Sequence, residues 1–280
     1  MSGLLASAAA QPFFLGSGAA RRFCLFYPAH GPARGALLYL HPFGDEMNKA
    51  RRMAALQCRA LAEQGYAVLQ IDLHGCGDSA GEFADARWDT WLDDCARGCG
   101  WLHEQLALPV TLWGLRLGAL LALDYARSAS TAPAALLLWQ PVLNGTAFLT
   151  QTLRLRIASD MFSEGAEKTG TKELRESLRC GTVLEVAGYA IHPALADSFD
   201  TLDAAAMAPL RCPVHWLEVV AAPERPMAPA GARVADAWRA GGAELHIATV
   251  ACQPFWSTQE IAECPPLLTA TSAIFSTSAS

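Results

Sequence analysis

The sequence lacks the features of a nucleic-acid-binding or membrane-spanning protein. Lys and Arg number 21 against 27 Asp and Glu, and the formal net charge is −6. Proteins that bind nucleic acid or anionic lipid cluster their basic residues, so we expect neither partner. No apolar run approaches the ~18 residues of a membrane helix; stretches such as 134–139 are strand-sized. The N-terminal segment has no basic region like that of a secretory signal, so we expect a cytoplasmic protein.

Metal-binding and nucleotide-binding motifs are also absent. The nine cysteines include no CxxC pair, the histidines form no HExxH pattern, and no GxxxxGK[ST] phosphate loop occurs. The glycines at 75–81 fail the spacing of a dinucleotide-binding fingerprint. We therefore expect no metal and no cofactor. A chain of 280 residues needs no disulfide to hold its core, and we expect nine reduced thiols that pack mostly as small apolar side chains.

What the sequence does have is an alternation of strand and helix patterns, with 52% hydrophobic residues. Continuous apolar runs, typical of strands buried on both faces, alternate with segments whose apolar residues repeat at helical spacing. The strand-like runs are 35–40, 67–73, 110–113, 134–139, 213–220 and 244–250, and the helical segments are 53–64, 88–102, 117–127 and 231–240. This alternation predicts an α/β fold with a mostly parallel, doubly wound sheet in a single domain spanning 1–280.

Two segments break the alternation. Residues from about 144 to 206 are richer in charge, and we expect them to form a cap inserted above the sheet. Residues 265–280 are rich in Ser, Thr and Ala, and we expect them to form a flexible tail.

Three segments in order make the fold prediction specific: LYLHPFGDEMNKARRM at 38–53, AVLQIDLHGCGDSAG at 67–81 and TLWGLRLGALLALDYA at 111–126. In the third, Gly114 and Gly118 bracket a sharp strand-to-helix turn that needs small residues for close backbone approach. Together the segments resemble the α/β-hydrolase fold over residues 20–262. Their combination is similar to the exosortase A system-associated hydrolase 2 family, found in bacteria that sort PEP-CTERM proteins and make exopolysaccharide. The resemblance implies a hydrolase of esters or thioesters.

The residues depart from ordinary hydrolase chemistry at the positions of the catalytic triad. The turn reads GLRLG, with Arg116 where the serine of GxSxG belongs. A guanidinium has no available lone pair and cannot form an acyl-enzyme. The loop at 250–257, where the resemblance places the histidine, contains none, and the loop after 213–220 offers only Glu224 as the acid. The ordinary serine-hydrolase mechanism is therefore excluded.

Arg116 begins a helix, where a cation is disfavoured by about 0.3–1 kcal/mol. We expect an anion beside it, either Glu46 or Asp45 or a bound carboxylate or phosphate. Two interpretations stay open: an internal ion pair that fills a disused site, and a pocket that recognises an anion. The residues expected to bind the ligand are Arg116, His41, Phe43, Glu46, Leu115, Phe255 and Trp256.

Other residues are weaker candidates for catalysis. Glu46 or Asp72 could activate water while Arg116 stabilises an oxyanion. Cys76, two residues after a histidine, and Cys252, near the place of the missing histidine, are candidate thiol nucleophiles. The sequence thus leaves a non-classical ester or thioester hydrolase, a protein that binds a small anionic or acyl ligand, and a non-catalytic scaffold or interaction protein of the same bacterial machinery. It does not fix the oligomeric state.

Overall fold

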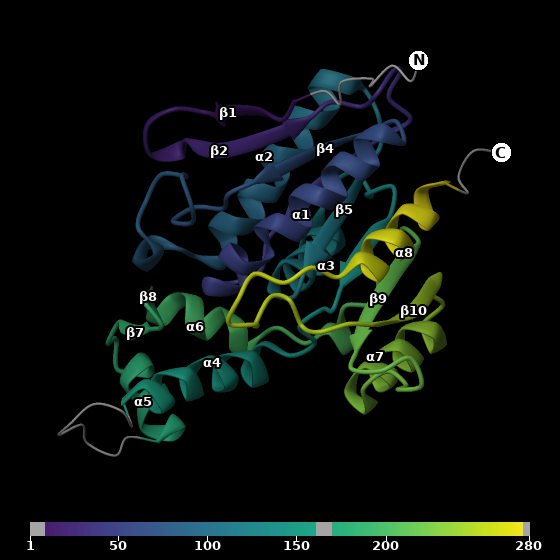
Figure 1. Cartoon of the computed structure of the whole chain (residues 1–280). Helices are drawn as coiled ribbons and strands as arrows, with labels where there is room; N and C mark the ends of the chain where they lie inside the picture. The colour runs from purple at the N-terminus through teal and green to yellow at the C-terminus, as the bar shows by residue number, and fades with distance from the viewer. Residues whose placement is uncertain (1–8, 161–169, 277–280) are drawn as a thin grey trace.

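A single eight-stranded sheet organises the chain in the computed structural model, which describes residues 9–160 and 170–276 (Figure 1). Its strand order is β1-β2-β4-β3-β5-β6-β9-β10, with β1 and β2 antiparallel to their neighbours and all other pairs parallel. The prediction of a mostly parallel α/β sheet is confirmed. The strands are β1 (Gln11–Leu15), β2 (Arg22–Tyr27), β3 (Gly35–Leu40), β4 (Tyr66–Ile71), β5 (Val110–Leu115), β6 (Leu136–Trp139), β9 (Val214–Val220) and β10 (Leu245–Ala251).

Helices cover both faces of this sheet and enclose two apolar cores. Helices α1 and α8 pack on one face, and α2, α3 and α7 pack on the other. All six residues of β3, at the centre, are buried, as its uninterrupted apolar run predicts. The helices are α1 (Asp45–Glu63), α2 (Trp88–Leu106), α3 (Leu117–Ser128), α7 (Pro229–Ala240) and α8 (Pro265–Ser276), with short 3-10 turns at Gly18–Ala20 and Phe83–Asp85.

The segment between β6 and β9, residues 144–206, is called the inserted segment below. Its described part contains α4 (Gly145–Asp160), α5 (Thr171–Arg179), β7 (Leu184–Val186), β8 (Tyr189–Ile191), α6 (Pro193–Asp200) and a 3-10 turn at Ala204–Ala206. An isolated antiparallel bridge between Asn144 and Asp203 joins its two ends. The rings of Phe148 and Phe199 pack edge-on against Phe43, which follows β3, at centroid distances of 5.4 and 5.8 Å. These contacts hold the inserted segment on the carboxyl end of the sheet.

The prediction of a flexible tail at 265–280 is wrong for residues 265–276, which form α8; residues 277–280 lie outside the described residues. Leu267, Thr271 and Phe275 recur every four residues and are buried. The Thr271 hydroxyl accepts a hydrogen bond of 2.9 Å from Nε1 of Trp139 in β6, and Phe275 packs on Tyr66. Tertiary packing of this face stabilises a helix that the Ser- and Thr-rich composition does not indicate.

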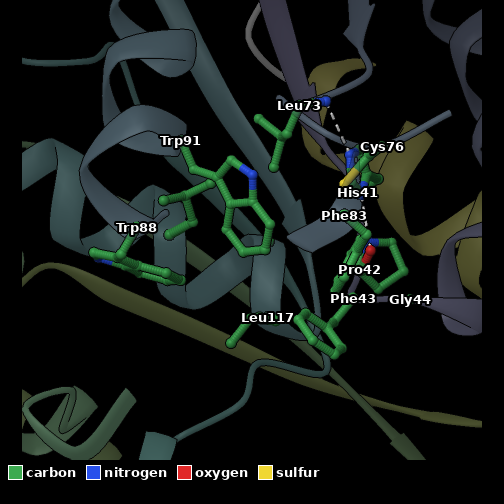
Figure 2. A pocket seen from close by; sticks show the side chains of 12 residues that line it. His41, Pro42, Phe43, Gly44, Leu73, Cys76, Phe83, Trp88, Trp91 and Leu117 are labelled. Carbon is green, nitrogen blue, oxygen red and sulfur yellow. Dashed lines mark hydrogen bonds between the residues drawn. The ribbon is translucent and has the colours of Figure 1, made fainter. Parts of the chain in front are cut away.

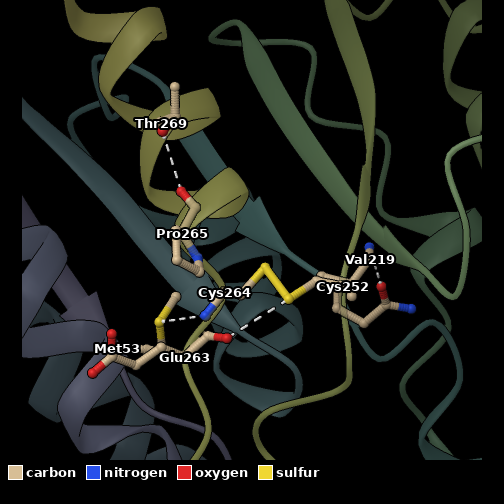
Figure 3. Close-up of a disulfide and its surroundings, with 8 residues drawn as sticks. Met53, Val219, Cys252, Glu263, Cys264, Pro265 and Thr269 are labelled. Atoms are coloured by element: carbon tan, nitrogen blue, oxygen red, sulfur yellow. Dashed lines mark hydrogen bonds between the residues drawn. A yellow bond between two sulfur atoms is a disulfide. The ribbon is translucent and has the colours of Figure 1, made fainter.

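The expectation of nine reduced thiols is also wrong for one pair, because Cys252 and Cys264 form a disulfide (Figure 3). Cys252 follows β10 and Cys264 precedes α8, and their Cα atoms are 5.9 Å apart. The other seven cysteines are free, and five of these are buried, in keeping with the packing role expected for them. In the described part of the chain, no helix has the length and apolarity to cross a membrane.

Candidate ligand site at the strand-to-helix elbow

The turn at 114–118 between β5 and α3, called the elbow below, has the sharp geometry that its glycines predict. Arg116 adopts φ 56° and ψ −117°. A Cβ on Gly114 would lie 2.4 Å from Cα of Ala119, and a Cβ on Gly118 would lie 2.2 Å from the carbonyl oxygen of Leu40. A positive φ costs a non-glycine residue about 1–3 kcal/mol, and such strain clusters at functional sites. The backbone at the elbow is thus strained around a residue that is not a nucleophile.

Glu46 supplies the anion expected beside Arg116. The Nε of Arg116 donates to Oε1 of Glu46 at 3.3 Å, and the guanidinium lies 5.5 Å from the ring centroid of Trp256. The two charged side chains are only 19% and 23% exposed, so solvent screens this pair less than it screens a surface pair. Asp45 instead pairs with Lys49, one turn along α1, at 3.4 Å. The cation at the start of α3 is therefore neutralised from within the chain.

The carboxyl group of Glu46 is nevertheless poorly satisfied. Burial raises its pKa, although the nearby charge of Arg116 and the hydrogen bond to it act in the opposite direction. Its second oxygen, Oε2, is buried without a hydrogen-bond partner among the described residues. The desolvation penalty on the ionised form therefore exceeds what the arginine returns.

A cavity of about 520 Å³ opens beside this pair, between the start of α1, the elbow and the inserted segment. Its charged lining residues come from the start of α1 and from Arg116, and the other lining residues are apolar and aromatic side chains together with Gln151, Thr152 and Ser257. We call it the ligand cavity. It is lined by Phe43, Gly44, Asp45, Glu46, Lys49, Arg116, Phe148, Gln151, Thr152, Leu155, Val186, Ala187, Tyr189, Trp256 and Ser257. Its size and mixed lining suit a small amphipathic molecule.

Four of the residues expected to bind ligand line this cavity, namely Arg116, Glu46, Phe43 and Trp256. Leu115 and Phe255 do not line it, because both side chains are fully buried in the core. The ring of Phe255 packs against Trp139 at 6.3 Å. Trp256, the next residue along the chain, faces the ligand cavity instead.

His41 follows β3 next to Gly118 of the elbow, and both nitrogens of its ring form hydrogen bonds with backbone groups. Its Nδ1 donates to the carbonyl of Pro42 at 2.8 Å, and its Nε2 accepts from the backbone N–H of Leu73 at 3.2 Å. Burial is the largest cause of its lowered pKa, which favours the neutral ring. It lines a small cavity with Phe43, Cys76 and other apolar residues (Figure 2). That cavity holds about 10 Å³, room for one water and not for an acyl chain.

The alternative catalytic candidates have partners or are buried away from the ligand cavity. Asp72 accepts from Nη2 of Arg51 at 3.1 Å and from the backbone N–H of Asp78 at 3.1 Å. Cys76 is buried, and its pKa is raised chiefly by desolvation, which disfavours the nucleophilic thiolate. Cys252 is held in the disulfide. Of the candidates, only Glu46 lies in the cavity beside Arg116.

Sequence reasoning missed two charged residues near the elbow. Lys49 reaches the ligand cavity from one turn beyond Glu46, a spacing of three that the helical pattern could have shown. Glu218, a lone carboxyl inside the apolar run of β9, is buried and accepts from Nε1 of Trp216 at 2.9 Å. Burial is the largest influence on its raised pKa, and Arg116 is among the groups that lower it. Glu224, the expected acid, is exposed in the loop after β9.

Comparisons with known proteins agree with the fold described above. The sequence profile of the family described as serine aminopeptidase S33 (Hydrolase_4) matches residues 31–195. Est1E from Butyrivibrio proteoclasticus, solved with ferulic acid bound, is similar over 95% of this chain and 98% of its own, at 13% identity and a TM-score of 0.69.

Two further solved structures are similar over nearly their whole length. A thermostable carboxyl esterase from Bacillus coagulans has 14% identity, covers 96% of this chain and 98% of its own, and gives a TM-score of 0.67. A monoglyceride lipase from Saccharomyces cerevisiae has 14% identity, covers 98% and 96%, and gives 0.63. No curated protein sequence matches the chain. At these identities the structural likeness establishes the α/β-hydrolase fold and not the activity.

Proposed function

The chain belongs to the serine aminopeptidase S33 family of α/β hydrolases, and from that premise we propose that it binds an amphipathic carboxylate without hydrolysing an acyl bond. The observation that supports this most directly is Arg116 at the elbow, turned toward the ligand cavity and paired with Glu46. A guanidinium cannot attack a carbonyl carbon, but it recognises a carboxylate well.

The catalytic triad of the fold is degenerate in this proposal. Besides the arginine in the nucleophile position, no histidine follows β10 in the segment from Cys252 to Cys264. The acid position is left to the exposed Glu224. Without a nucleophile and a base to activate it, an acyl-enzyme does not form.

The hydrogen-bond donors of Arg116 that Glu46 does not occupy support the binding of a carboxylate. Among the described residues, the hydrogen bond of its side chain to protein runs through Nε, which leaves the two Nη atoms as donors for a planar, bidentate carboxylate. Apolar walls from Phe148, Leu155 and Val186 then take the hydrocarbon part of the ligand. An aromatic carboxylic acid, ferulic acid, is bound in the similar Est1E structure, which makes this class of ligand a reasonable first choice.

The test compares a carboxylate with its matched alcohol. Octanoate and 1-octanol are titrated into the purified protein, and the thermal midpoint and the heat of binding are recorded. We expect octanoate, and not the alcohol, to raise the midpoint as its concentration passes Kd, and Arg116→Ala to abolish the effect. Arg239→Ala, an exposed arginine on α7, serves as the control and retains binding. Equal octanoate binding by Arg116→Ala contradicts the proposal.

A second candidate, the non-classical ester or thioester hydrolase, has one observation in its favour. Glu46 offers a carboxyl with a raised pKa and an unpartnered oxygen beside a cation, an arrangement that could activate water while Arg116 stabilises an oxyanion. Assays with nitrophenyl esters and acyl thioesters separate the two candidates. If wild type turns over these substrates and both Glu46→Gln and Arg116→Ala lose that turnover, the hydrolase candidate is favoured over the binding proposal.

The cellular setting is a further part of the proposal. The resemblance of the segments at 38–53, 67–81 and 111–126 to exosortase A system-associated hydrolases supports a role for the binding protein in exopolysaccharide production, in the cytoplasm, as a ligand carrier or as a scaffold for another protein. Deleting the gene in its host and restoring it as wild type or as Arg116→Ala tests this. Restoration of exopolysaccharide by both forms favours the scaffold over the ligand carrier.

A further inference from the structure

One wall of the ligand cavity belongs to a loop that the disulfide closes. Residues 253–263, called the tethered loop below, run from Cys252 after β10 to Cys264 before α8 (Figure 3). Trp256 and Ser257 within it line the ligand cavity, and the ring of Trp256 lies next to the Arg116 guanidinium. The position of this loop therefore sets the shape of the carboxylate end of the site.

The tethered loop also has attachments to α1. Lys49 donates from Nζ to the carbonyl oxygen of Thr258 at 2.7 Å, and Arg52 forms an ion pair with Glu263. The Arg52 side chain is 63% exposed and the Glu263 side chain 36%, and an exposed pair of this kind stabilises by about 0–1 kcal/mol at most. The disulfide adds a covalent restraint between the ends of the loop, and the fully buried Phe255 holds its middle against Trp139.

We propose that Cys252 and Cys264 form a reversible thiol–disulfide pair that controls the ligand cavity through the placement of Trp256. The inference rests on the proposed ligand binding at the same cavity. In the oxidised form the loop is closed and Trp256 is held beside Arg116. In the reduced form the direct link between the two ends is lost, the parts of the loop on either side of the buried Phe255 sample more conformations, and a ligand must order Trp256 again on binding.

The exposure of the two sulfurs sets the course of the reduction. Cys252 is partly exposed, whereas Cys264 is fully buried. A thiolate of a small cellular dithiol attacks Sγ of Cys252 and forms a mixed disulfide, while Cys264 leaves as a thiolate and takes up a proton. The second thiol of the reductant, as its thiolate, then attacks the reductant sulfur of the mixed disulfide. Cys252 leaves as a thiolate and takes up a proton. Two electrons pass from the dithiol to the pair, and the dithiol becomes a disulfide.

Hydrogen exchange measured by mass spectrometry tests the tether without any ligand. The wild-type chain is compared before and after treatment with dithiothreitol, and intact mass shows whether the pair has gained two hydrogen atoms. We expect exchange in peptides covering 253–263 to rise by about a hundredfold on reduction, the scale of closing the ring from Cys252 to Cys264. A pair already reduced in protein purified with air present, or unchanged exchange on reduction, overturns the proposal.

Octanoate affinity measured on the same samples tests the control of the ligand cavity. We expect reduction to weaken binding about tenfold, and Cys252→Ser to weaken it equally under oxidising conditions. Cys180→Ser, an exposed free thiol at the end of α5, is the control and responds to reduction as wild type does. Changed exchange with unchanged affinity refutes the control of the cavity by the pair. If no form binds octanoate, the proposed function fails, and with it the claim that the pair controls a ligand, whereas the exchange result still decides whether the tether exists.

Discussion

Glu46→Gln separates two opposed accounts of the ion pair at the elbow. Simple pair counting gives about 5 kcal/mol of attraction for charges 3.3 Å apart at an effective dielectric of about 20, so that loss of the carboxylate would destabilise the fold. The pKa of Glu46 is raised, however, because burial outweighs Arg116. The ionised carboxylate is therefore less favourable in the folded chain than in the unfolded one, and we expect neutral Gln to leave the thermal midpoint at pH 7 unchanged or higher.

Glu46→Gln should also strengthen ligand binding, whereas the loss of a residue that lines a site ordinarily weakens it. A carboxylate bound to the Nη atoms of Arg116 lies close to Glu46, which holds Nε. Two negative charges about 6 Å apart at the same effective dielectric of about 20 repel each other by about 2.8 kcal/mol. Glu46→Gln removes this repulsion, so we expect octanoate to bind up to about a hundredfold more tightly, as measured by titration calorimetry.

The pH dependence of wild type follows from the sign of the shift. The folded pKa of Glu46 is raised above an unfolded value of about 4.3, so the folded chain binds more protons than the unfolded one between the two values. Its contribution to stability is complete below about 4.3 and is lost as pH rises through the folded pKa. The affinity for the ionised form of octanoate, corrected for the titration of octanoic acid itself, falls over the same rise, because Glu46 becomes charged. Glu218 has a raised pKa as well, so the difference between wild type and Glu46→Gln isolates Glu46.

Two results would refute this reasoning. A midpoint lowered by several degrees in Glu46→Gln at pH 7 would show that attraction outweighs burial, since about 1 kcal/mol corresponds to about 2–4 °C in a chain near this size. Weaker octanoate binding by that variant would show that Glu46 positions the arginine for the ligand. Glu176→Gln, which removes the same charge from an exposed pair on α5, is the control and changes neither quantity.

Three further substitutions and one matched control test the elbow and the core. Arg116→Ser is expected to give no hydrolysis of nitrophenyl esters above background, because the segment after β10 offers no histidine base; measurable turnover would contradict this. Gly118→Ala places a Cβ against carbonyl oxygens at the end of β3 and should cost about 3 kcal/mol in urea unfolding, whereas Gly100→Ala, in open space on α2, should gain about 0.5–1 kcal/mol. Asp94→Asn leaves Arg22, 4% exposed, without its charged partner and should cost about 3–5 kcal/mol by the same measurement; a loss below about 1 kcal/mol would be inconsistent with a buried pair.

The parts of the fold that the sequence predicts are those where one local requirement decides the structure. The apolar run of β3 has no polar face to expose, so it is buried on both sides. The elbow needs small residues at 114 and 118, and the structure shows backbone atoms where their side chains would lie. Helix α8 and the Cys252–Cys264 disulfide depend instead on which distant segments meet. Neither composition nor sequence spacing contains that information.

The same division applies within the candidate site. The unfavourable position of a cation at a helix start predicts an anion beside Arg116, and the structure supplies Glu46. Phe255 and Trp256 are adjacent aromatic residues in a loop without regular period, and only the fold decides that the first is buried against β6 while the second faces the ligand cavity. The need for an anion can be predicted from Arg116 alone, because it follows from the charge of that residue and its place at a helix start. The direction of a loop side chain requires both ends of the loop to be known, and here strand β10 and helix α8 set them, with the Cys252–Cys264 bond between the two.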